Sequence, residues 1–294
     1  MTEPVVSLAM PSYNQAGYLA EAIDSVLAQD YPHVELLVVD DGSTDGSIDV
    51  ARSYGSRLAY FATREHAGQV AALAHGFEHA RGDLLGWLNS DDVLFPDAIS
   101  RAAGELRRDP RLLLVYGDNV FIDEESREVA PLPAREWDPR AMVRSCDNHV
   151  PQPGVLFRRE ALERAPLREG YYLFDFELWL RMSAHGAAKR LGPPPLAGYR
   201  IHSESKTAVA PLPKARDYVR FADEFLSGPS LPAYLRPYAA AGRRNGYRRA
   251  AVYFYDGGDL RRARRYALRS RNWPILVRAL LPARIRALSR SGRA

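Results

Sequence analysis

Short apolar runs alternate with helix-like periodicity through the first part of the chain. Apolar runs predict strands at residues 5–10, 34–39, 58–61, 84–88 and 112–116. Apolar positions at helical spacing predict helices around residues 19–27, 70–80 and 97–108. Strands that alternate with helices in this way predict an α/β fold, in which a doubly wound, mostly parallel sheet is flanked by helices.

Beyond Gly117 the pattern becomes less regular. Five prolines before Gly154 predict loops, at Pro131, Pro133, Pro139, Pro151 and Pro153. A strand at 154–157, a helix around 176–184 and a strand at 197–201 follow. From about Lys214 the chain reads as several helices, with breaks expected at Pro229, Pro232, Pro237, Pro274 and Pro282. We therefore expect a sheet domain at residues 1–210 and a basic helical region at residues 211–294.

The composition is that of a globular protein, because 46% of the 294 residues are hydrophobic and 26% are charged. A single cysteine, Cys146, excludes an internal disulfide and favours a reducing compartment. The first residues do not resemble a signal peptide, and we find no apolar run near the roughly 20 residues that a membrane span needs. We expect a cytoplasmic protein.

Charge is divided unevenly along the chain. Residues 241–294 carry fifteen Arg, no Lys and only Asp256 and Asp259, a net charge of +13. Since the whole chain has a net charge of +4, the first 240 residues carry 4 − 13 = −9. An acidic body with a basic tail predicts that the tail faces phosphate or another anionic surface.

Two of the predicted strands end in acidic segments. The run 34–39 leads directly into Asp40 and Asp41, and the run 84–88 leads into Asn89-Ser90-Asp91-Asp92. Open α/β sheets bind ligands at the carboxyl ends of their strands, and clustered carboxylates suit Mg²⁺ or Mn²⁺ bridged to a diphosphate. The alternatives are local: Asp41 or the second segment starts a turn, and Asp45 or Ser47 caps a helix.

Three segments together resemble the ordered motifs of glycosyltransferase family 2, over about the first 205 residues. They are Pro11-Ser12-Tyr13-Asn14, the stretch from Val38 to Asp45, and Trp87-Leu88-Asn89-Ser90-Asp91-Asp92. The resemblance implies a GT-A fold, the Rossmann-like fold of nucleotide-diphospho-sugar transferases, followed here by the helical tail.

The resemblance also implies roles for individual residues. Pro11, Tyr13 and Asp41 are expected to hold the base and ribose, with Asp40 nearby and Asn14 completing the first motif. The family's Asp-X-Asp motif binds a divalent metal and the donor, and Asn89 replaces its first acid here. Asp91 is therefore the expected metal ligand, and Asp92 is the second choice.

The segment Leu173-Phe174-Asp175-Phe176-Glu177-Leu178-Trp179 resembles the family's Glu-Asp-Tyr-Asp-Leu-Trp segment, which supplies the catalytic base. By this match Asp175 is the expected base. An acid at the start of a helix is also a common N-cap, and Glu177 has the spacing to pair with Arg181 along a helix.

Three histidines are further candidates. His202, after the strand at 197–201, resembles a metal or diphosphate ligand of some family members; the alternative is a surface or structural residue. His66 and Gly68 open a helix whose first amides are expected to meet phosphate or ribose. His149 lies where the acceptor pocket of such a fold is expected, so Gln152 and Gly154 are expected to border it.

The implied activity is that of an inverting, metal-dependent glycosyltransferase of the hexosyltransferase type. Its donor is expected to be a UDP- or dTDP-sugar, and its acceptor a saccharide or lipid-linked hydroxyl in bacterial cell-surface polysaccharide or glycolipid synthesis. A nucleotidyltransferase that makes the donor is an alternative, but the first strand lacks the Gly-rich loop that holds a triphosphate. A dinucleotide-dependent oxidoreductase would need Gly-x-Gly-x-x-Gly there.

The basic tail leaves other partners open. Nucleic acid is one, although the acidic body argues against it. Apolar residues between Trp273 and Leu288 interleave with Arg, and this pattern favours attachment to anionic lipid at the inner face of the membrane. A helical cap packed on the core, with its Arg in water, fits the same pattern equally well.

Overall fold

The computed structural model describes residues 3–203, 205 and 211–280. The chain forms two compact units, and neither is continuous in sequence. The first consists of Met1–Trp137, His149–Glu169 and Met182–His202, and the second of Asp138–Asn148, Gly170–Arg181 and Ser203–Ala294. The second unit takes chain segments from both sides of residue 210. The expected domain boundary at that position stays a prediction.

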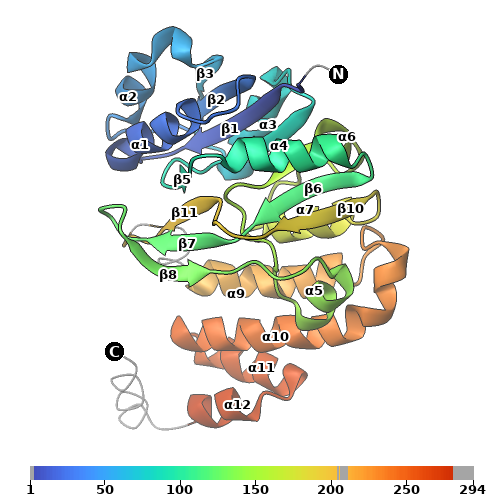
Figure 1. Cartoon of the computed structure of the whole chain (residues 1–294). Helices are drawn as coiled ribbons and strands as arrows, with labels where there is room; N and C mark the ends of the chain where they lie inside the picture. The colour runs from blue at the N-terminus through green and yellow to red at the C-terminus, as the bar shows by residue number, and fades with distance from the viewer. Residues whose placement is uncertain (1–2, 204, 206–210, 281–294) are drawn as a thin grey trace. The chain divides into compact units, whose positions relative to one another are not determined.

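The first unit is built on two sheets (Figure 1). Its strands are β1 (Val6–Ser12), β2 (Val34–Asp40), β3 (Tyr60–Thr63), β4 (Leu84–Trp87), β5 (Val93–Leu94), β6 (Leu112–Gly117), β7 (Asn119–Ile122), β8 (Glu128–Leu132), β9 (Leu156–Arg158), β10 (Ala187–Leu191) and β11 (Ala197–Arg200). The larger sheet has the order β10-β6-β9-β4-β1-β2-β3, and the smaller has the order β5-β11-β7-β8. In the larger sheet only β9 is antiparallel to its neighbours. The predicted α/β fold with a mostly parallel sheet is confirmed.

Helices cover both faces of the larger sheet. They are α1 (Ala16–Leu27), α2 (Ser47–Ser53), α3 (Gln69–His79), α4 (Ala98–Arg108) and α6 (Arg159–Arg164), with a 3₁₀ turn, η1 (Gly55–Arg57). Alternate residues of β1, such as Leu8 and Met10, share one apolar cluster with α1 and α4. Ala9 points to the opposite face, where a Cβ added to Gly76 of α3 would lie 3.2 Å from it. The sheet is therefore buried on both sides, as expected for a parallel sheet.

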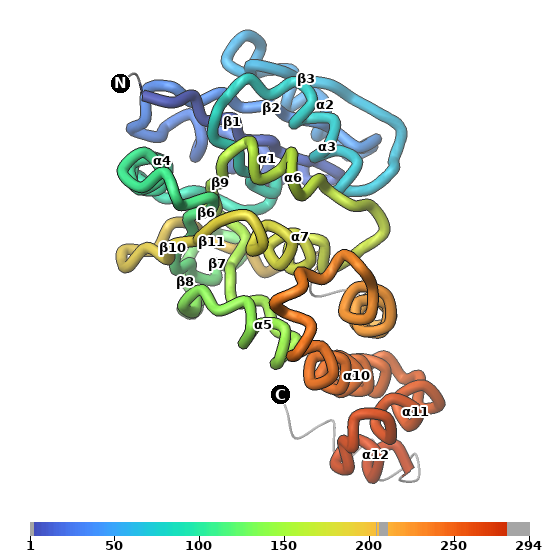
Figure 2. The backbone as a smooth tube through the Cα atoms, turned by 90° about the vertical axis from the view of Figure 1, so that its right-hand side faces the viewer, coloured from blue at the N-terminus to red at the C-terminus, as the bar shows by residue number. Residues whose placement is uncertain are grey.

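The second unit is helical. Its elements are α5 (Pro139–Ser145), α7 (Phe174–Met182, whose last residue belongs to the first unit), α9 (Pro211–Arg220), the π-helix η2 (Phe221–Phe225), the 3₁₀ helix η3 (Ala233–Tyr238), α10 (Ala239–Asp256), α11 (Leu260–Ser270) and α12 (Trp273–Leu280). Aromatic side chains join these helices: Phe176 stacks on Phe221 with ring centroids 4.8 Å apart, and Phe254 stacks on Tyr266 at 5.6 Å. In Figure 2 α10, α11 and α12 lie side by side. The predicted helical C-terminal region is confirmed.

The region between Gly117 and Gly154 is more regular than the sequence predicted. It contains the short elements β7, β8 and α5, so the expectation of loops was wrong at Pro131 and Pro139, whereas Pro133, Pro151 and Pro153 lie outside helices and strands as expected. Pro131 lies on β8, an edge strand that pairs only with β7, so its missing N–H costs the sheet little. Pro139 is the first residue of α5, whose N-cap Asp138 accepts a hydrogen bond from the Ala141 N–H. These prolines occupy positions where strands and helices tolerate them.

Proline has the same role at the start of α12, where Pro274 is the second residue of the helix, so the break expected there is a helix start. Part of the predicted tail, namely Leu281, Pro282, Arg284, Ile285, Arg286, Leu288 and Arg290, lies outside the described residues. Among the described helices, none combines the length and the apolar character needed to cross a membrane.

Candidate functional site

The predicted site residues of the first unit gather at one edge of the larger sheet. β4, β1 and β2 are neighbours and run parallel, so the segments that follow them emerge at the same edge. Ser12 pairs with Asp40 at the ends of β1 and β2. The three motif segments are thus brought together by strand order, as the sequence predicted.

Asp40 forms the turn that follows β2. It is fully buried, its Oδ1 accepts hydrogen bonds from the backbone N–H groups of Gly42 (3.1 Å) and Ser43 (2.8 Å), and its Oδ2 accepts one from Ser43 Oγ. Gly42 has a φ of +87°, which glycine adopts without strain. The turn anticipated at Asp41 is therefore made by Asp40, whose carboxylate faces the protein.

Asn14 and Asp45 hold the first two motifs together. The N–H of Asn14 donates to Ser43 Oγ (2.9 Å), and its Oδ1 accepts from the Thr44 N–H (2.8 Å). Asp45 accepts from the N–H groups of Ala16 and Ser47. Burial raises the pKa of Asp45, but these hydrogen bonds outweigh it, so the pKa lies below its usual value. Asp45 therefore links two loops, and Gly46 occupies the N-cap position of α2.

Asp41 fastens the segment before α3 to the edge of the sheet. One of its oxygens accepts from Gly68 N–H (2.7 Å) and contacts His66 Nδ1 (2.9 Å), and the other accepts from Ala67 N–H (3.1 Å). Only 3% of the Asp41 side chain is exposed. Asp41 is therefore a buried support for the loop that carries His66.

Above this support, two rings face solvent. Tyr13 is 45% exposed, the His66 side chain is 56% exposed, and their ring centroids lie 4.3 Å apart with an interplanar angle of 32°. Pro11, by contrast, is buried within β1. Tyr13 and His66 therefore present an exposed pair of rings, a surface of the kind on which planar aromatic groups stack.

Asn89 is the centre of a hydrogen-bond network at the end of β4. Its Oδ1 accepts from Gln69 Nε2 (2.7 Å), and its Nδ2 donates to Asp92 Oδ2 (3.0 Å) and Gln152 Oε1 (3.2 Å). Gln152 in turn donates to the backbone oxygen of Trp87 (2.8 Å). Asn89 uses both donors and acceptors here, which a carboxylate at this position could not do.

Asp92 faces inward. It is 1% exposed, and its Oδ1 accepts from the Arg200 backbone N–H (2.9 Å) while Oδ2 accepts from Asn89. Burial, and then the neighbouring charge of Asp91, raise the pKa of Asp92 well above its usual value. Both of its oxygens already have partners inside the protein, so Asp92 is less suited to bind a metal ion than the more exposed Asp91.

Asp91 and His202 meet across the two sheets of the unit. His202 Nε2 lies 3.2 Å from Asp91 Oδ2, with 20% of the Asp91 side chain and 4% of the His202 side chain exposed. The Tyr18 ring packs beside the His202 ring, with centroids 4.9 Å apart. The two residues are 111 positions apart in sequence, and both were predicted as ligands.

These two side chains suit a divalent cation that is shared with a diphosphate. Carboxylate oxygen and imidazole nitrogen are ligands for Mn²⁺, and Mg²⁺ takes one or two carboxylates and completes its shell with phosphates and water. Among residues 3–203, 205 and 211–280, no group of three or more His, Cys, Asp and Glu is arranged to hold a metal alone. A cation here would therefore depend on the nucleotide for the rest of its ligands.

Arg200 was not predicted, although it lies two residues before His202, near the end of the predicted strand 197–201. Its guanidinium is fully buried and donates to the Asp91 backbone oxygen (2.7 Å), the Asp123 backbone oxygen (2.8 Å) and Glu21 Oε2 (2.6 Å). It also lies over the Tyr18 ring at 4.8 Å. Arg200 thus holds the backbone of Asp91 in place.

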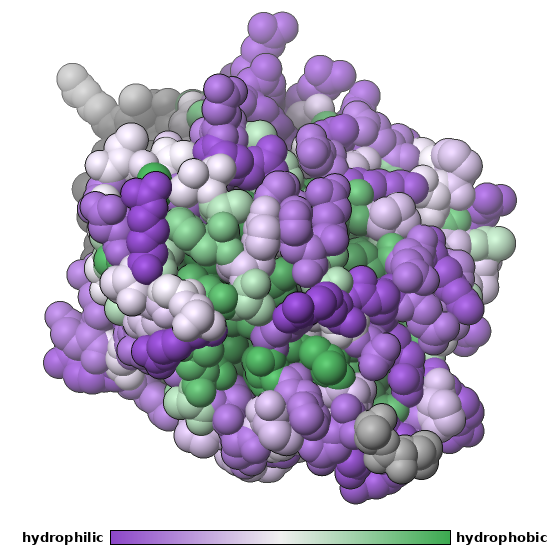
Figure 3. Space-filling view, turned by 90° about the horizontal axis from the view of Figure 1, so that it is seen from above, coloured by the Kyte–Doolittle hydropathy of each residue, from purple (hydrophilic) through white to green (hydrophobic). Residues whose placement is uncertain are grey.

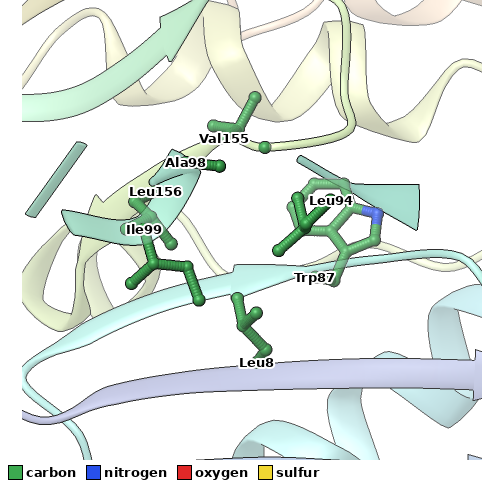
Figure 4. Close-up of a pocket in the computed structure, with 8 residues that line it drawn as sticks. Leu8, Trp87, Leu94, Ala98, Ile99, Val155 and Leu156 are labelled. Carbon is green, nitrogen blue, oxygen red and sulfur yellow. The ribbon is translucent and has the colours of Figure 1, made fainter. Parts of the chain in front are cut away.

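The small cavity beneath this edge is not a ligand site. It has a volume of about 10 Å³ and is lined by Leu8, Trp87, Leu94, Ala98, Ile99, Gly154, Val155 and Leu156 (Figure 4). An apolar space of this size lies between the sheet and α4 and is too small for more than one water molecule. In the view of Figure 3, hydrophilic side chains surround apolar ones in a hollow near the centre of the face.

Two of the residues expected near the acceptor pocket, His149 and Gly154, are packed closely against other parts of the protein. His149 is buried, and its Nε2 lies 3.4 Å from Arg135 Nη1. Gly154 has a φ of +81°, and a Cβ there would lie 2.8 Å from Leu196 Cβ. Gln152 differs, because it reaches the Asn89 network described above.

In the second unit, the two carboxylates of α7 have different surroundings. Glu177 is 1% exposed and makes a two-bond ion pair with Arg181, at 2.7 and 2.8 Å, as the helical spacing predicted. Asp175 is partly exposed, and its Oδ2 accepts from Asn148 Nδ2 (2.9 Å). Of the two, Asp175 is the one accessible for proton transfer.

Comparison with known proteins gives a consistent result. Residues 7–164 match the family model described as Glycosyl transferase family 2. An uncharacterized glycosyltransferase of Rickettsia typhi is 31% identical over 191 residues, and chondroitin synthase of Escherichia coli is 28% identical over 200 residues. These matches cover 60% and 64% of this chain, but only 58% and 28% of the two relatives.

Solved structures share the fold. S. aureus TarS 1–349, in complex with UDP-GlcNAc, superposes with a TM-score of 0.69 at 16% identity, covering 89% of this chain and 79% of that one. The mannosyltransferase PcManGT of Pyrobaculum calidifontis, in complex with GDP-Man and Mn²⁺, gives 0.61 at 20% identity, covering 95% and 86%. At these identities the likeness establishes the fold alone.

Proposed function

The chain belongs to glycosyltransferase family 2, and from this premise we propose that it transfers a sugar from a nucleotide-diphosphate sugar to an acceptor hydroxyl, with inversion at the anomeric carbon. The observation that carries the proposal is the meeting of Asp91 with His202 at 3.2 Å, on the sheet edge where the three motif segments emerge. The solved relatives in complex with UDP-GlcNAc and with GDP-Man support a nucleotide sugar as the donor.

We assign the nucleoside to the surface around Tyr13 and His66. The base stacks on this ring pair, and Asp41 acts by holding the loop that carries His66, together with Gly68. Asp40 and Asn14 keep the adjoining turn in place, and Pro11 is buried in β1, where it pairs with Val39. The pyrophosphate then lies toward Asn89 and Asp91, at the end of the neighbouring strand β4.

Asp91 and His202 are the proposed ligands of a Mg²⁺ or Mn²⁺ ion that enters with the donor. When bound, such an ion supplies Lewis-acid neutralisation of the charge on the departing diphosphate. The protein's part is to hold the two ligands in register: Arg200 fixes the Asp91 backbone, and Asp92 fixes the Arg200 backbone.

Asp175 is the proposed general base, which takes the proton of the acceptor hydroxyl. It is supported by its place in a segment that resembles the family's base motif and by the engagement of Glu177 with Arg181. A hydrogen bond from Asn148 Nδ2 orients the Asp175 carboxylate. A positioned carboxylate of this kind typically contributes about 10²–10⁴-fold to the rate.

The acceptor is proposed to be a saccharide or a lipid-linked hydroxyl of the bacterial cell surface, and the reaction is proposed to take place in the cytoplasm. The single cysteine, Cys146, fits that compartment, because the chain cannot form the internal disulfides that are common in oxidising compartments. The nucleotidyltransferase and nucleic-acid-binding alternatives gain no support from the comparisons.

The donor assignment is tested with a panel of UDP-, dTDP- and GDP-sugars, each with Mn²⁺, with Mg²⁺ and with EDTA. One nucleotide should raise the melting temperature by several degrees and be hydrolysed slowly, in both cases only with metal, because ligand binding stabilises the folded state. The Asp91→Asn variant should lose the metal-dependent stabilisation and hydrolysis. The Asp49→Asn variant, which changes an exposed acid on α2, should keep both. Equal stabilisation of Asp91→Asn and the wild type would remove Asp91 from the metal site.

The base assignment is tested with Asp175→Asn, which keeps the shape of the side chain and its contact with Asn148. Transfer to an acceptor should fall about 10²–10⁴-fold while donor-induced stabilisation stays unchanged, because the base acts only in the chemical step. The matched control is Glu224→Gln, an exposed acid of the same unit paired with Arg220. Undiminished transfer by Asp175→Asn would exclude it as the base.

A further inference from the structure

Helix α12 has apolar side chains on two opposite sides. Ile275 and Ala279 are buried against the rest of the unit, at 7% and 0% exposure. Trp273, Val277 and Leu280 are 61%, 57% and 60% exposed, and their spacing places them in one stripe along the helix. Packing within the described part of the unit accounts for the first side only. The second side is an exposed apolar stripe, which soluble proteins usually avoid.

The orientation of this stripe is fixed by α11. Arg264 of α11 donates from Nε and Nη2 to the backbone oxygen of Ala279, at 2.9 and 2.6 Å. Ala279 lies on the buried side of α12, so this contact holds the stripe of Trp273, Val277 and Leu280 outward. Leu268 of α11 adds another exposed apolar side chain, at 57%.

Arginines accompany these apolar side chains. The exposed ones on and between the two helices are Arg261, Arg262, Arg265, Arg269, Arg271 and Arg278. Arg269 lies over the Tyr247 and Tyr266 rings, at 5.5 and 5.7 Å, so its long side chain is supported by aromatic surface. Residues 239–280 contain eleven Arg and two Asp, a net charge of +9. The surface is thus both strongly basic and apolar.

We propose that the surface formed by α11 and α12 docks on an anionic lipid bilayer. Trp273 suits the bilayer interface, where its ring is apolar and its N–H stays hydrated, and Val277 and Leu280 enter the acyl boundary beside it. The arginines extend their heads to lipid phosphates while their stems stay in contact with apolar groups. Nucleic acid would match the arginines but would leave the stripe in water.

This inference is independent of the proposed transfer reaction, although it would bring a glycosyltransferase to the surface where lipid-linked acceptors lie. Each arginine near an anionic surface is worth roughly fivefold in binding, and the apolar stripe adds a component that does not depend on salt. Binding should therefore weaken in high salt without disappearing.

The test is co-sedimentation of the full chain with vesicles of phosphatidylcholine alone or with about one-third phosphatidylglycerol. The wild type should bind the anionic vesicles at least about tenfold more strongly than the neutral ones. Replacing Trp273, Val277 and Leu280 together by Ser should weaken binding at least about tenfold, and Val129→Ser, an equally exposed residue of β8, should not. Because Trp273 is the most exposed of the four tryptophans, the fluorescence of the protein should shift to the blue on binding.

Three outcomes overturn the proposal. The first is the absence of binding to anionic vesicles by the wild type, and the second is retained vesicle binding by the triple Ser variant. The third is a salt-sensitive gel shift with duplex DNA or RNA that the triple Ser variant keeps and that a variant combining Arg261→Gln, Arg271→Gln and Arg278→Gln loses. Donor-induced stabilisation is measured on every variant and should match the wild type, so failure of the docking surface is distinguishable from failure of the proposed reaction.

Discussion

Aspartates of similar sequence context have different roles in this protein. Asp40 and Asp92 are buried and accept hydrogen bonds from the protein itself, and Asp41 supports a loop. Asp91 is the acid of these segments that keeps a partly exposed carboxylate beside His202. The sequence predicted that these acids gather at one edge, but their division of roles depends on the local turns.

Residues that brace the site were harder to predict. Gln69 and Gln152 reach Asn89 from 20 and 63 positions away, and Arg200 reaches Glu21 from 179 positions away. No local pattern marks such pairs, because strand order decides which side chains meet. Arg200 had one signal in the sequence, its place two residues before the candidate ligand His202.

Arg200→Lys should weaken metal-dependent donor binding. Lysine keeps the charge but loses the planar fork that binds the Asp91 and Asp123 backbone oxygens and Glu21 together. The Mn²⁺ concentration for half-maximal donor-induced stabilisation should rise by about 10–100-fold, as for other residues that orient metal ligands.

Arg101→Lys is the matched control for this change. Arg101 also binds two backbone oxygens, those of Gly192 and Pro194, away from the site. Both variants should lower the melting temperature, but only Arg200→Lys should shift the Mn²⁺ requirement. Identical Mn²⁺ curves for the two variants would reduce Arg200 to a purely structural residue.

At the scale of elements, apolar periodicity predicted the strands and helices that are regular and buried. It missed β8 and α5, because proline predicts a break, whereas Pro131 lies on an edge strand and Pro139 begins a helix. Burial on both faces gives a long apolar run, whereas β8 is largely exposed and has no such run. The sequence signal was weakest where the element has the least core contact.

Two helical glycines should respond in opposite ways to alanine. Gly104 of α4 has open space where a Cβ would be, so Gly104→Ala should raise the free energy of unfolding by about 0.5–1 kcal/mol. Gly242 of α10 lies against α5, and a Cβ there would be 2.4 Å from the Val143 backbone oxygen. Gly242→Ala should therefore destabilise the protein by about 1–3 kcal/mol, because the helices would have to separate.

Thermal or urea unfolding of the two variants measures the difference directly, and each is the control for the other. Both substitutions replace glycine by alanine inside a helix, so helix propensity changes equally. A stabilised Gly242→Ala protein would show that α5 and α10 do not pack as closely as described.

At the scale of the whole molecule, resistance to acid depends on ion pairs and hydrogen bonds far from the candidate site. Glu35, at the start of β2, accepts from Ser7 Oγ (2.6 Å) and from Arg81 N–H (2.6 Å) and Nε (2.9 Å). Burial raises the pKa of Glu35, but these hydrogen bonds outweigh it, so the pKa lies below its usual value. This network joins β1, β2 and the start of β4 at the edge opposite the site.

Because the pKa of Glu35 is lower in the folded than in the unfolded chain, its contribution to stability is complete above the unfolded value of about 4.3 and is lost as the pH falls through the folded value. Glu35→Gln should therefore lower the melting temperature at pH 7, and the difference from the wild type should shrink steadily below about pH 4.3. Melting curves between neutral and acid pH measure it, with the exposed Glu128→Gln as a control that changes neither the melting temperature nor its pH dependence. A Glu35→Gln difference that is constant with pH would mean that shape, and not ionisation, is what this network contributes.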